Sequence, residues 1–440
     1  MNIRRHFGPV AQAAWLWLWS AAVGALAVAV TTGFRGLSLW IDWLATGHRA
    51  TGLVASAYSL SPWHRALVCA GGGLLAGALL QAGLAWARRG PHGDKHLDYM
   101  DAARAGNANL NDRITLARSV SALVSIGTGS SIGREGPMVQ LAAWFASWPA
   151  RLLPMSARQR NALMVAGVAA GIGCAYRAPI AGVVFVLELA LGFFARDTLA
   201  PVFIASATAS ALMYWLVDPG PLYTMPAVDL APTSLGLALA AGVFFGVVAW
   251  VFIKLLEMGR KCFAHIPHLT LRLGAGGALV GLISMGVPEV WGNGYSVVAQ
   301  VLQGQLLWQA LTAILVAKVA ATAISSGSGA IGGVLTPALL IGAAAGSLDA
   351  QIALGQLPPD VVGDPRALSV IGMAAVLAGV THAPLMAIVM VLEMTGQFQL
   401  VVPVMLACGL AFAVSTQFGT QPLYGNPIEG AISPQKEQIA

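Results

Sequence analysis

Two glycine-rich stretches, each running into a Gly-to-Pro segment, carry the residues whose types and spacing indicate chemistry. The first reads GTGSSIGREGPMVQ (127–140) and the second GSGAIGGVLTPALL (327–340). Glycine lets backbone N–H groups approach a ligand, proline fits a first helical turn, and a helix N-terminus carries unpaired N–H donors and a positive partial charge. Two such ends that meet would bind an anion weakly enough to release it. The alternative is that the glycines only permit close helix packing.

The elements that must position these stretches lie in lipid. Of 440 residues, 57% are hydrophobic and only 10% are charged, and the mean hydropathy is +0.73. A soluble domain is about one quarter charged, so a water-soluble chain is excluded and an all-α polytopic membrane protein is expected. The net charge of +6 comes from scattered Lys and Arg, which favours no nucleic-acid partner.

Apolar segments recur along the whole chain, and several are too short to cross about 30 Å of hydrocarbon. Short segments interrupted by Gly or Pro indicate broken helices whose ends meet inside the membrane, where ion sites form. The predicted segments are 11–33, 66–87, 114–132, 137–154, 161–176, 178–195, 199–217, 233–257, 273–287, 307–325, 331–348, 368–380, 383–395 and 398–417.

An internal repeat divides the chain into two related halves. Residues 114–137 match 314–337 at seven of 24 positions, including the aligned pairs Gly133/Gly333 and Pro137/Pro337. RAPIAGVVFVLELA (177–190) matches HAPLMAIVMVLEMT (382–395) at six of 14 positions, with Glu188 opposite Glu393. Two homologous membrane halves commonly face each other in inverted topology, with the substrate between them near the midplane.

Charge placement predicts the orientation of the first part of the chain. Arg4 and Arg5 precede the first apolar stretch, so we expect a cytoplasmic N-terminus. That stretch is too long and too Trp-rich for a signal peptide and predicts a retained helix. All but three of the 24 Lys and Arg lie at or before Arg272. The preference of positive residues for the cytoplasmic side therefore does not orient the part of the chain after Arg272. The four cysteines are widely spaced and are expected to be unpaired packing residues.

GREGP at 133–137, the later GxxxP segment, the repeated Ala-Pro/Glu blocks and QPLYG at 421–425 together resemble the CLC chloride channels and transporters, from about Arg118 to Tyr424. The chain lacks two motifs of the family, the glutamate after the position of Glu188 and the GSGIP segment, and in this it resembles the bacterial ClcB-like branch. The resemblance implies a homodimer with one pore per subunit and inverted repeats over about 34–217 and 233–424, in a multi-pass protein of the bacterial inner membrane. A short tail, 425–440, would follow without CBS domains.

The resemblance also implies the residues that hold the anion. Backbone amides of both Gly-to-Pro segments would line the path, with the Tyr424 hydroxyl at the central ion. Leu335 stands where the family usually has phenylalanine, which removes an aromatic from the pore wall but keeps the backbone donor. The implied anion-binding residues are Gly133, Arg134, Glu135, Gly136, Val334, Leu335, Thr336 and Tyr424.

Glu135 is the candidate gating residue. It lies at an expected helix start, where a carboxylate is stabilised and resembles the permeating anion. In the family that this chain resembles, the glutamate occupies an anion site when charged and vacates it when protonated. The alternative is a partner of the helix dipole without a gating role.

Other charged positions are paired by the repeat. Glu188 and Glu393 are expected to have a structural role at helix ends. Arg118 and Lys318 would support the anion electrostatically or place their charges at a helix end. Proton-coupled members of the family have a glutamate directly after the position of Glu188, where this chain has Leu189. The family's GSGIP motif is also missing, since the corresponding stretch reads HGDKHLDYMDAA (92–103).

These features favour selective chloride transport with channel-like conduction, and the leading alternative is Cl⁻/H⁺ antiport through Glu135 and a non-standard inner proton route. A fluoride-selective member is a further alternative, although the filter of such members departs from GREGP. Gly129 to Gly133 match the G-x-S-x-G pattern of a serine hydrolase, but the preceding stretch is a membrane segment and the second half has no serine there. The expected partners are chloride, membrane lipid and a second subunit, without cofactor or metal.

Overall fold

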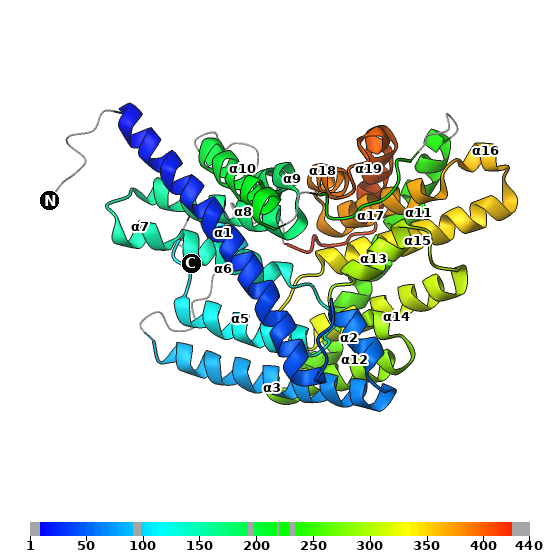
Figure 1. Cartoon of the computed structure of the whole chain (residues 1–440), viewed down its shortest axis with the longest axis horizontal. Helices are drawn as coiled ribbons and strands as arrows, with labels where there is room; N and C mark the ends of the chain where they lie inside the picture. Colours follow the sequence, from blue (N-terminus) through cyan, green and yellow to red (C-terminus); the bar gives the residue numbers. More distant parts are fainter. Residues whose placement is uncertain are drawn as a thin grey trace, which may run out of the picture.

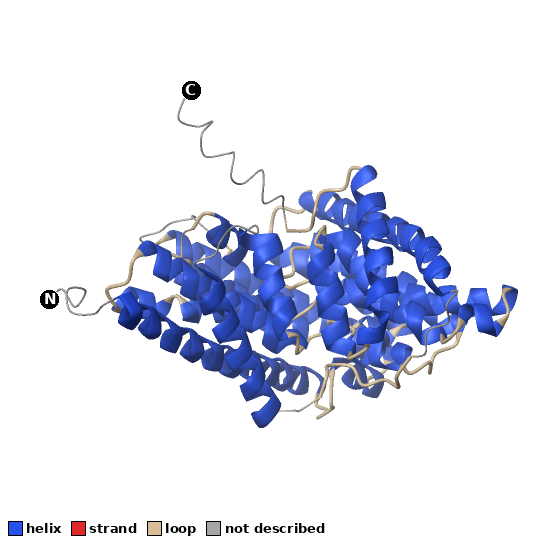
Figure 2. Cartoon of the chain, turned by 90° about the horizontal axis from the view of Figure 1, so that it is seen from above, coloured by secondary structure: helices blue, strands red, loops and turns tan. Residues whose placement is uncertain are grey.

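The computed structural model describes residues 9–90, 98–106, 108–191, 198–217, 220–228 and 234–424. In Figure 2 every regular element drawn is a helix. The helices of the first half are α1 (Pro9–Thr46), α2 (Leu53–Ser59), α3 (Pro62–Arg88), α4 (Tyr99–Arg104), α5 (Asp112–Gly127), α6 (Glu135–Ala146), α7 (Trp148–Leu152), α8 (Ala157–Tyr176), α9 (Pro179–Phe185), the π-helical turn η2 (Val186–Leu191) and α10 (Leu199–Leu216).

The second half begins at the long helix α11. Its elements are α11 (Ser234–Ala264), α12 (Leu269–Gly286), the 3-10 turn η4 (Pro288–Val290), α13 (Tyr295–Leu302), α14 (Trp308–Gly327), α15 (Leu335–Gln356), α16 (Pro359–Val362), α17 (Pro365–Thr381), α18 (Pro384–Thr395), the 3-10 turn η5 (Phe398–Leu400) and α19 (Val401–Gln417). Figure 1 shows the blue-to-green first half beside the green-to-red second half, with α1 running obliquely across the first.

Eight helical segments in the described part of the chain are long and apolar enough to cross a membrane, and α17 and α18 are shorter apolar helices. The expected polytopic all-α architecture is confirmed. The structure differs from the predicted segments in several places, among them that α1 continues to Thr46 and that α2 and α16 were not predicted. The segment 137–154 is divided between α6 and α7, the polar stretch before α5 contains the short helix α4, and α13 was not predicted because its eight residues follow a turn.

Glycines outside the two glycine-rich stretches bring several helices into backbone contact. A Cβ on Gly342 in α15 would overlap the carbonyl of Gly372 in α17, and the reverse substitution would overlap the carbonyl of Gly342. A Cβ on Gly277 in α12 would overlap the carbonyl of Cys69 in α3. Close packing through small residues is typical of membrane helices, which gain no hydrophobic energy from association in lipid.

Glu188 and Glu393 each contact the start of a helix in the other half of the chain. Glu188 accepts hydrogen bonds from the N–H groups of Leu385 (3.2 Å) and Met386 (2.7 Å) in the first turn of α18. Glu393 accepts them from Ile180 (3.1 Å) and Ala181 (2.8 Å) in the first turn of α9. Each carboxylate thus satisfies helix-end donors of the other half. The predicted structural role at a helix end is confirmed.

Arg177 and His382, which the repeat also pairs, both adopt left-handed backbone, with φ of 52° and 55°, and end α8 and α17. All four cysteines are free, and Cys69, Cys174 and Cys408 are buried as expected of packing residues. Cys262 is exposed near the end of α11, so the packing prediction is wrong for this residue.

Candidate functional site

The two glycine-rich loops pair with each other at one point. Gly133 donates to the carbonyl of Gly333 (2.6 Å), and Gly333 donates to the carbonyl of Gly133 (2.7 Å), in an isolated antiparallel bridge. The flanking Gly129 and Gly329 have positive φ of 98° and 89°, which lets both loops turn alike before the bridge. Loops that are 200 residues apart in the sequence therefore meet antiparallel inside the protein.

The bridge sets the starts of two helices against each other. Arg134 is the N-cap of α6, whose first residue is Glu135, and Val334 is the N-cap of α15, whose first residue is Leu335. A Cβ added to Gly136 would lie 3.4 Å from the amide nitrogen of Gly333, so the first turn of α6 lies against the opposite loop. The unpaired N–H groups of both first turns, with their positive partial charge, are thus concentrated around one point.

The Glu135 side chain is buried at this point, with 4% of its surface exposed. Neither of its oxygens accepts a hydrogen bond from an amide of α6 in the described part of the chain. Instead, Oε1 accepts a 2.7 Å hydrogen bond from Nδ2 of Asn293, and the buried Oε2 has no hydrogen-bond partner among the described residues. Oε2 lies against Gly133, where an added Cβ would overlap it. The carboxylate is therefore held at one oxygen only.

Thr336 is buried in the first turn of α15 and interacts with the first half. Its Oγ1 lies 3.3 Å from the hydroxyl of Tyr176, the last residue of α8. Val334 and Leu335 are also buried. The second Gly-to-Pro segment therefore presents backbone to the site while its side chains pack into the core.

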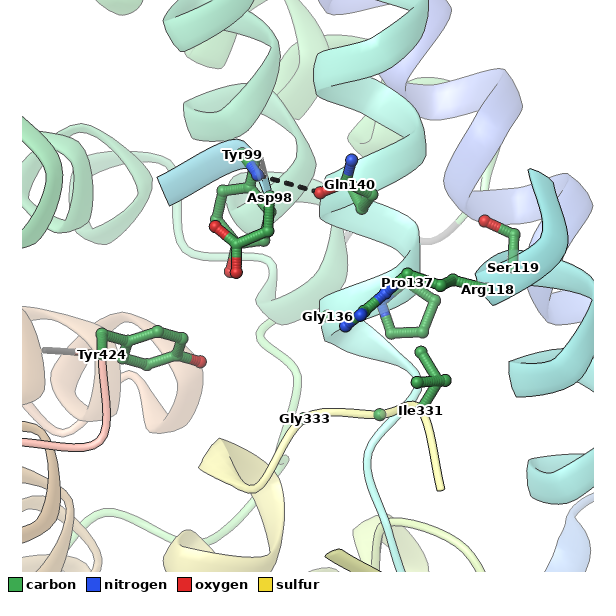
Figure 3. A pocket seen from close by; sticks show the side chains of 11 residues that line it. Asp98, Tyr99, Arg118, Ser119, Gly136, Pro137, Gln140, Ile331, Gly333 and Tyr424 are labelled. Atoms are coloured by element: carbon green, nitrogen blue, oxygen red, sulfur yellow. Dashed lines mark hydrogen bonds between the residues drawn. The ribbon is translucent and has the colours of Figure 1, made fainter. Parts of the chain in front are cut away.

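A cavity of about 130 Å³ lies beside the first turn of α6. In Figure 3 the Tyr424 side chain points into it, and Arg118 extends from α5 past Pro137 toward Gly136. Its lining residues come from both halves: Asp98, Tyr99, Arg118, Ser119, Gly136, Pro137, Gln140, Ile331, Gly332, Gly333 and Tyr424. The cavity thus combines helix-start backbone, one cation, one carboxylate and two phenols.

Arg118 and Lys318 have different surroundings despite their pairing in the repeat. Arg118 is half-buried and lines the cavity. Lys318 is fully buried and its Nζ donates to the carbonyls of Val290 (3.0 Å) and Gly292 (2.7 Å). The expectation of a charge placed at a helix end is wrong for Lys318, because α14 continues to Gly327 and the side chain turns inward onto a loop.

Leu189 lies in the π-helical turn η2, with its side chain buried. Its carbonyl accepts hydrogen bonds from Nε (3.3 Å) and Nη2 (2.9 Å) of Arg104 in α4. Of the stretch 92–103, residues 92–97 lie outside the described residues. Asp98 caps α4 by accepting from the amides of Met100 and Asp101, and Tyr99 follows it into the cavity lining.

Sequence reasoning missed three side chains that shape the site: Asn293, Tyr99 and Gln140. Gln140 accepts from the Tyr99 amide (2.9 Å) and donates to the Thr115 hydroxyl (3.2 Å), which joins α4, α5 and α6. Tyr99 and Tyr424 both line the cavity. Asn293 stands in a Gly-Asn-Gly turn, a pattern that predicts a turn but not the partner of its amide.

The family model described as "Voltage gated chloride channel" matches residues 72–416. A ClcB-like protein of Ralstonia nicotianae is 43% identical over 418 residues, covering 92% of this chain and 95% of its own. The chain belongs to this family. The "Voltage-gated ClC-type chloride channel ClcB" of Escherichia coli is 37% identical over 411 residues, covering 92% of this chain and 96% of its own.

Solved structures show the same CLC fold. A slow cyanobacterial Cl⁻/H⁺ antiporter superposes with a TM-score of 0.80 at 20% identity, covering 96% of this chain and 99% of its own. A CLC-type fluoride/proton antiporter gives 0.75 at 24% identity, covering 94% and 98%. This CLC protein is therefore a multi-pass membrane protein for anion transport.

Membership of the CLC family contradicts the hydrolase alternative. Ser131, the candidate nucleophile, has its hydroxyl 3.3 Å from that of Thr322, and its amide donates to the hydroxyl of Ser325 (3.0 Å). In this chain the G-x-S-x-G pattern is part of the first glycine-rich loop, in which Gly129 provides the positive φ of the turn.

Proposed function

We propose that this protein conducts chloride passively through a pathway between the starts of α6 and α15, with Glu135 as its gate. The observation that carries the proposal is the buried, singly held carboxylate of Glu135 beside the paired loops. A carboxylate there competes with a permeating anion for the same positive partial charges. Protonation removes its charge, so the positive partial charges no longer attract the side chain. The side chain then leaves the path, and the path opens.

The proposed anion path runs from this carboxylate to the cavity. Its backbone donors are those of Gly133, Arg134, Glu135, Gly136, Val334, Leu335 and Thr336, and the Tyr424 hydroxyl serves the central ion. Arg118 raises the local anion concentration from the cavity wall. Such a site binds with many partial charges and one cation, which suits an ion that must leave again.

Passive conduction is favoured over antiport by Leu189. Coupled transport needs a second group that carries protons between Glu135 and the cytoplasm, and a leucine side chain carries none. The Escherichia coli relative is named a chloride channel, which agrees with this choice. We further propose a homodimer in the bacterial inner membrane, with one pathway per subunit and a cytoplasmic N-terminus.

Flux from liposomes tests both parts of the proposal. We expect chloride efflux that follows its gradient and rises as the pH falls, and Glu135→Gln to give fast flux with little pH dependence. If a chloride gradient drives protons uphill at a fixed ratio, the protein is an antiporter and another proton route exists. If Glu135→Gln keeps the wild-type rate and pH profile, Glu135 is not the gate.

A further inference from the structure

The loop between η4 and α13 places Asn293 against the proposed gate. Gly292 and Gly294 on either side have positive φ of 64° and 88°. The Asn293 amide is used at both ends, because Oδ1 accepts from the Tyr295 amide (3.1 Å) while Nδ2 donates to Glu135 Oε1 (2.7 Å). This arrangement presents a donor to the carboxylate, which suits the charged form of Glu135.

Lys318 fixes the loop that carries Asn293. Its buried Nζ donates to the carbonyls of Val290 and Gly292, the latter directly before Asn293. A Cβ on Gly294 would lie 3.5 Å from Lys318 Cε, so the loop lies directly on this side chain. A continuous set of contacts therefore runs from α14 in the second half through the loop to α6 in the first.

Other charged and titratable groups lie near Glu135 and, within the described part of the chain, are not its hydrogen-bond partners. They interact with it electrostatically and come from α1, the N-cap of α6, α14, α8, the segment before α11, and the segment after α19: Arg35, Arg134, Lys318, Tyr176, Tyr223 and Tyr424. Among the described residues, Asn293 is the side chain that hydrogen-bonds the carboxylate, and Oε2 has no such partner.

We propose that Asn293 is a positioning residue that holds the charged Glu135 side chain in the closed conformation, so that its amide sets the pH at which the pathway opens. The inference rests on the proposed gating role of Glu135. Loss of the amide donor weakens the charged, closed conformation relative to the protonated, open one. Transport then begins at a higher pH.

The test measures chloride efflux against pH for the full-length protein in vesicles of phosphatidylethanolamine and phosphatidylglycerol. For Asn293→Leu, which keeps the branching at Cγ but removes the donor, the pH of half-maximal flux rises by about one unit, and flux near neutral pH rises up to ~10-fold. Asn293→Asp, which adds a like charge, gives a shift in the same direction that is at least as large. Asn293→Gln, which keeps an amide, gives a smaller shift.

The Glu135→Gln background separates a positioning role from a structural one. There, Asn293→Leu changes the flux less than twofold, because no charge remains to hold. The inference is overturned if Asn293→Leu, folded and reconstituted at the wild-type level, keeps the wild-type pH profile, or if it changes flux equally in both backgrounds. Failure of the gate itself is distinguishable, because Glu135→Gln alone then retains the wild-type profile.

Discussion

Gly133 and Gly333 exchange two backbone hydrogen bonds, yet an added Cβ would overlap a Glu135 carboxylate oxygen at Gly133 and lie 3.9 Å from it at Gly333. The two positions are equivalent in the repeat and differ in what an added methyl group meets. At Gly133 a Cβ overlaps Glu135 Oε2, whereas at Gly333 the nearest atom is the Gly136 nitrogen at 3.4 Å. A Cβ at Gly133 would also lie 3.0 Å from the Gly333 carbonyl, so the two substitutions differ chiefly in their contact with the Glu135 carboxylate.

We therefore expect Gly133→Ala to displace the Glu135 side chain and raise chloride flux at neutral pH several-fold. Gly333→Ala, the matched control, should keep the wild-type flux and pH profile, because ordinary van der Waals contact accommodates its methyl group. Liposome efflux measures both. Equal effects of the two substitutions would show that the bridge, and not the carboxylate, responds to the added methyl group.

Arg118→Met and Lys318→Met should affect different properties, chloride flux for the first and stability for the second. Arg118 lines the cavity, so its loss should lower chloride flux several-fold at low ionic strength, with less effect at high salt, because salt screens its charge. Flux measured across a series of salt concentrations checks this. An unchanged flux at low salt would exclude Arg118 from the anion path.

Lys318→Met should lower stability, because the buried carbonyls of Val290 and Gly292 lose their donor. An unpaired buried polar group costs about 1–3 kcal/mol. Thermal unfolding of the purified protein in detergent measures the loss, and Arg118→Met is the control. A Lys318→Met protein as stable as wild type would mean that other groups satisfy this loop.

Glu188 and Glu393, each of which caps a helix in the other half, should contribute similarly to the stability of the protein. Glu188→Ala and Glu393→Ala should each destabilise the protein by about 1–2 kcal/mol, as expected for a lost N-terminal cap. Glu257→Ala is the control, since Glu257 forms only an exposed ion pair with Lys254 (3.1 Å) and such pairs contribute about 0–1 kcal/mol. Losses no larger than that of the control would argue against capping.

Cys262 offers a native reporter of orientation. It is exposed near the end of α11, directly after Arg260 and Lys261. Positive residues at the end of a membrane helix favour the cytoplasmic side. A membrane-impermeant maleimide should therefore label inside-out vesicles and not intact cells, and Cys262→Ser should abolish the signal. Labelling of intact cells would reverse the proposed topology.

Much of the fold could be predicted because lipid imposes simple rules on composition and because the repeat aligns Gly, Pro and Glu in order. The pairing of Glu188 with Glu393 predicted helix-end roles, and the structure adds that each caps the other half. The position of the Lys318 side chain could not be predicted, because the sequence of an apolar helix does not show whether a lysine in it points outward or into the protein. Asn293 was missed because its partner is 158 residues away in the sequence.

The exchange of caps also imposes an order on biosynthesis. The N–H groups at the start of α9 have their hydrogen-bond acceptor in a carboxylate that is synthesised 213 residues later. At 5–20 residues per second, the ribosome needs roughly 10 to 40 s to supply it. The first half therefore enters the membrane with an incomplete helix end, and water, lipid headgroups or the insertion machinery must satisfy those donors until translation reaches Glu393.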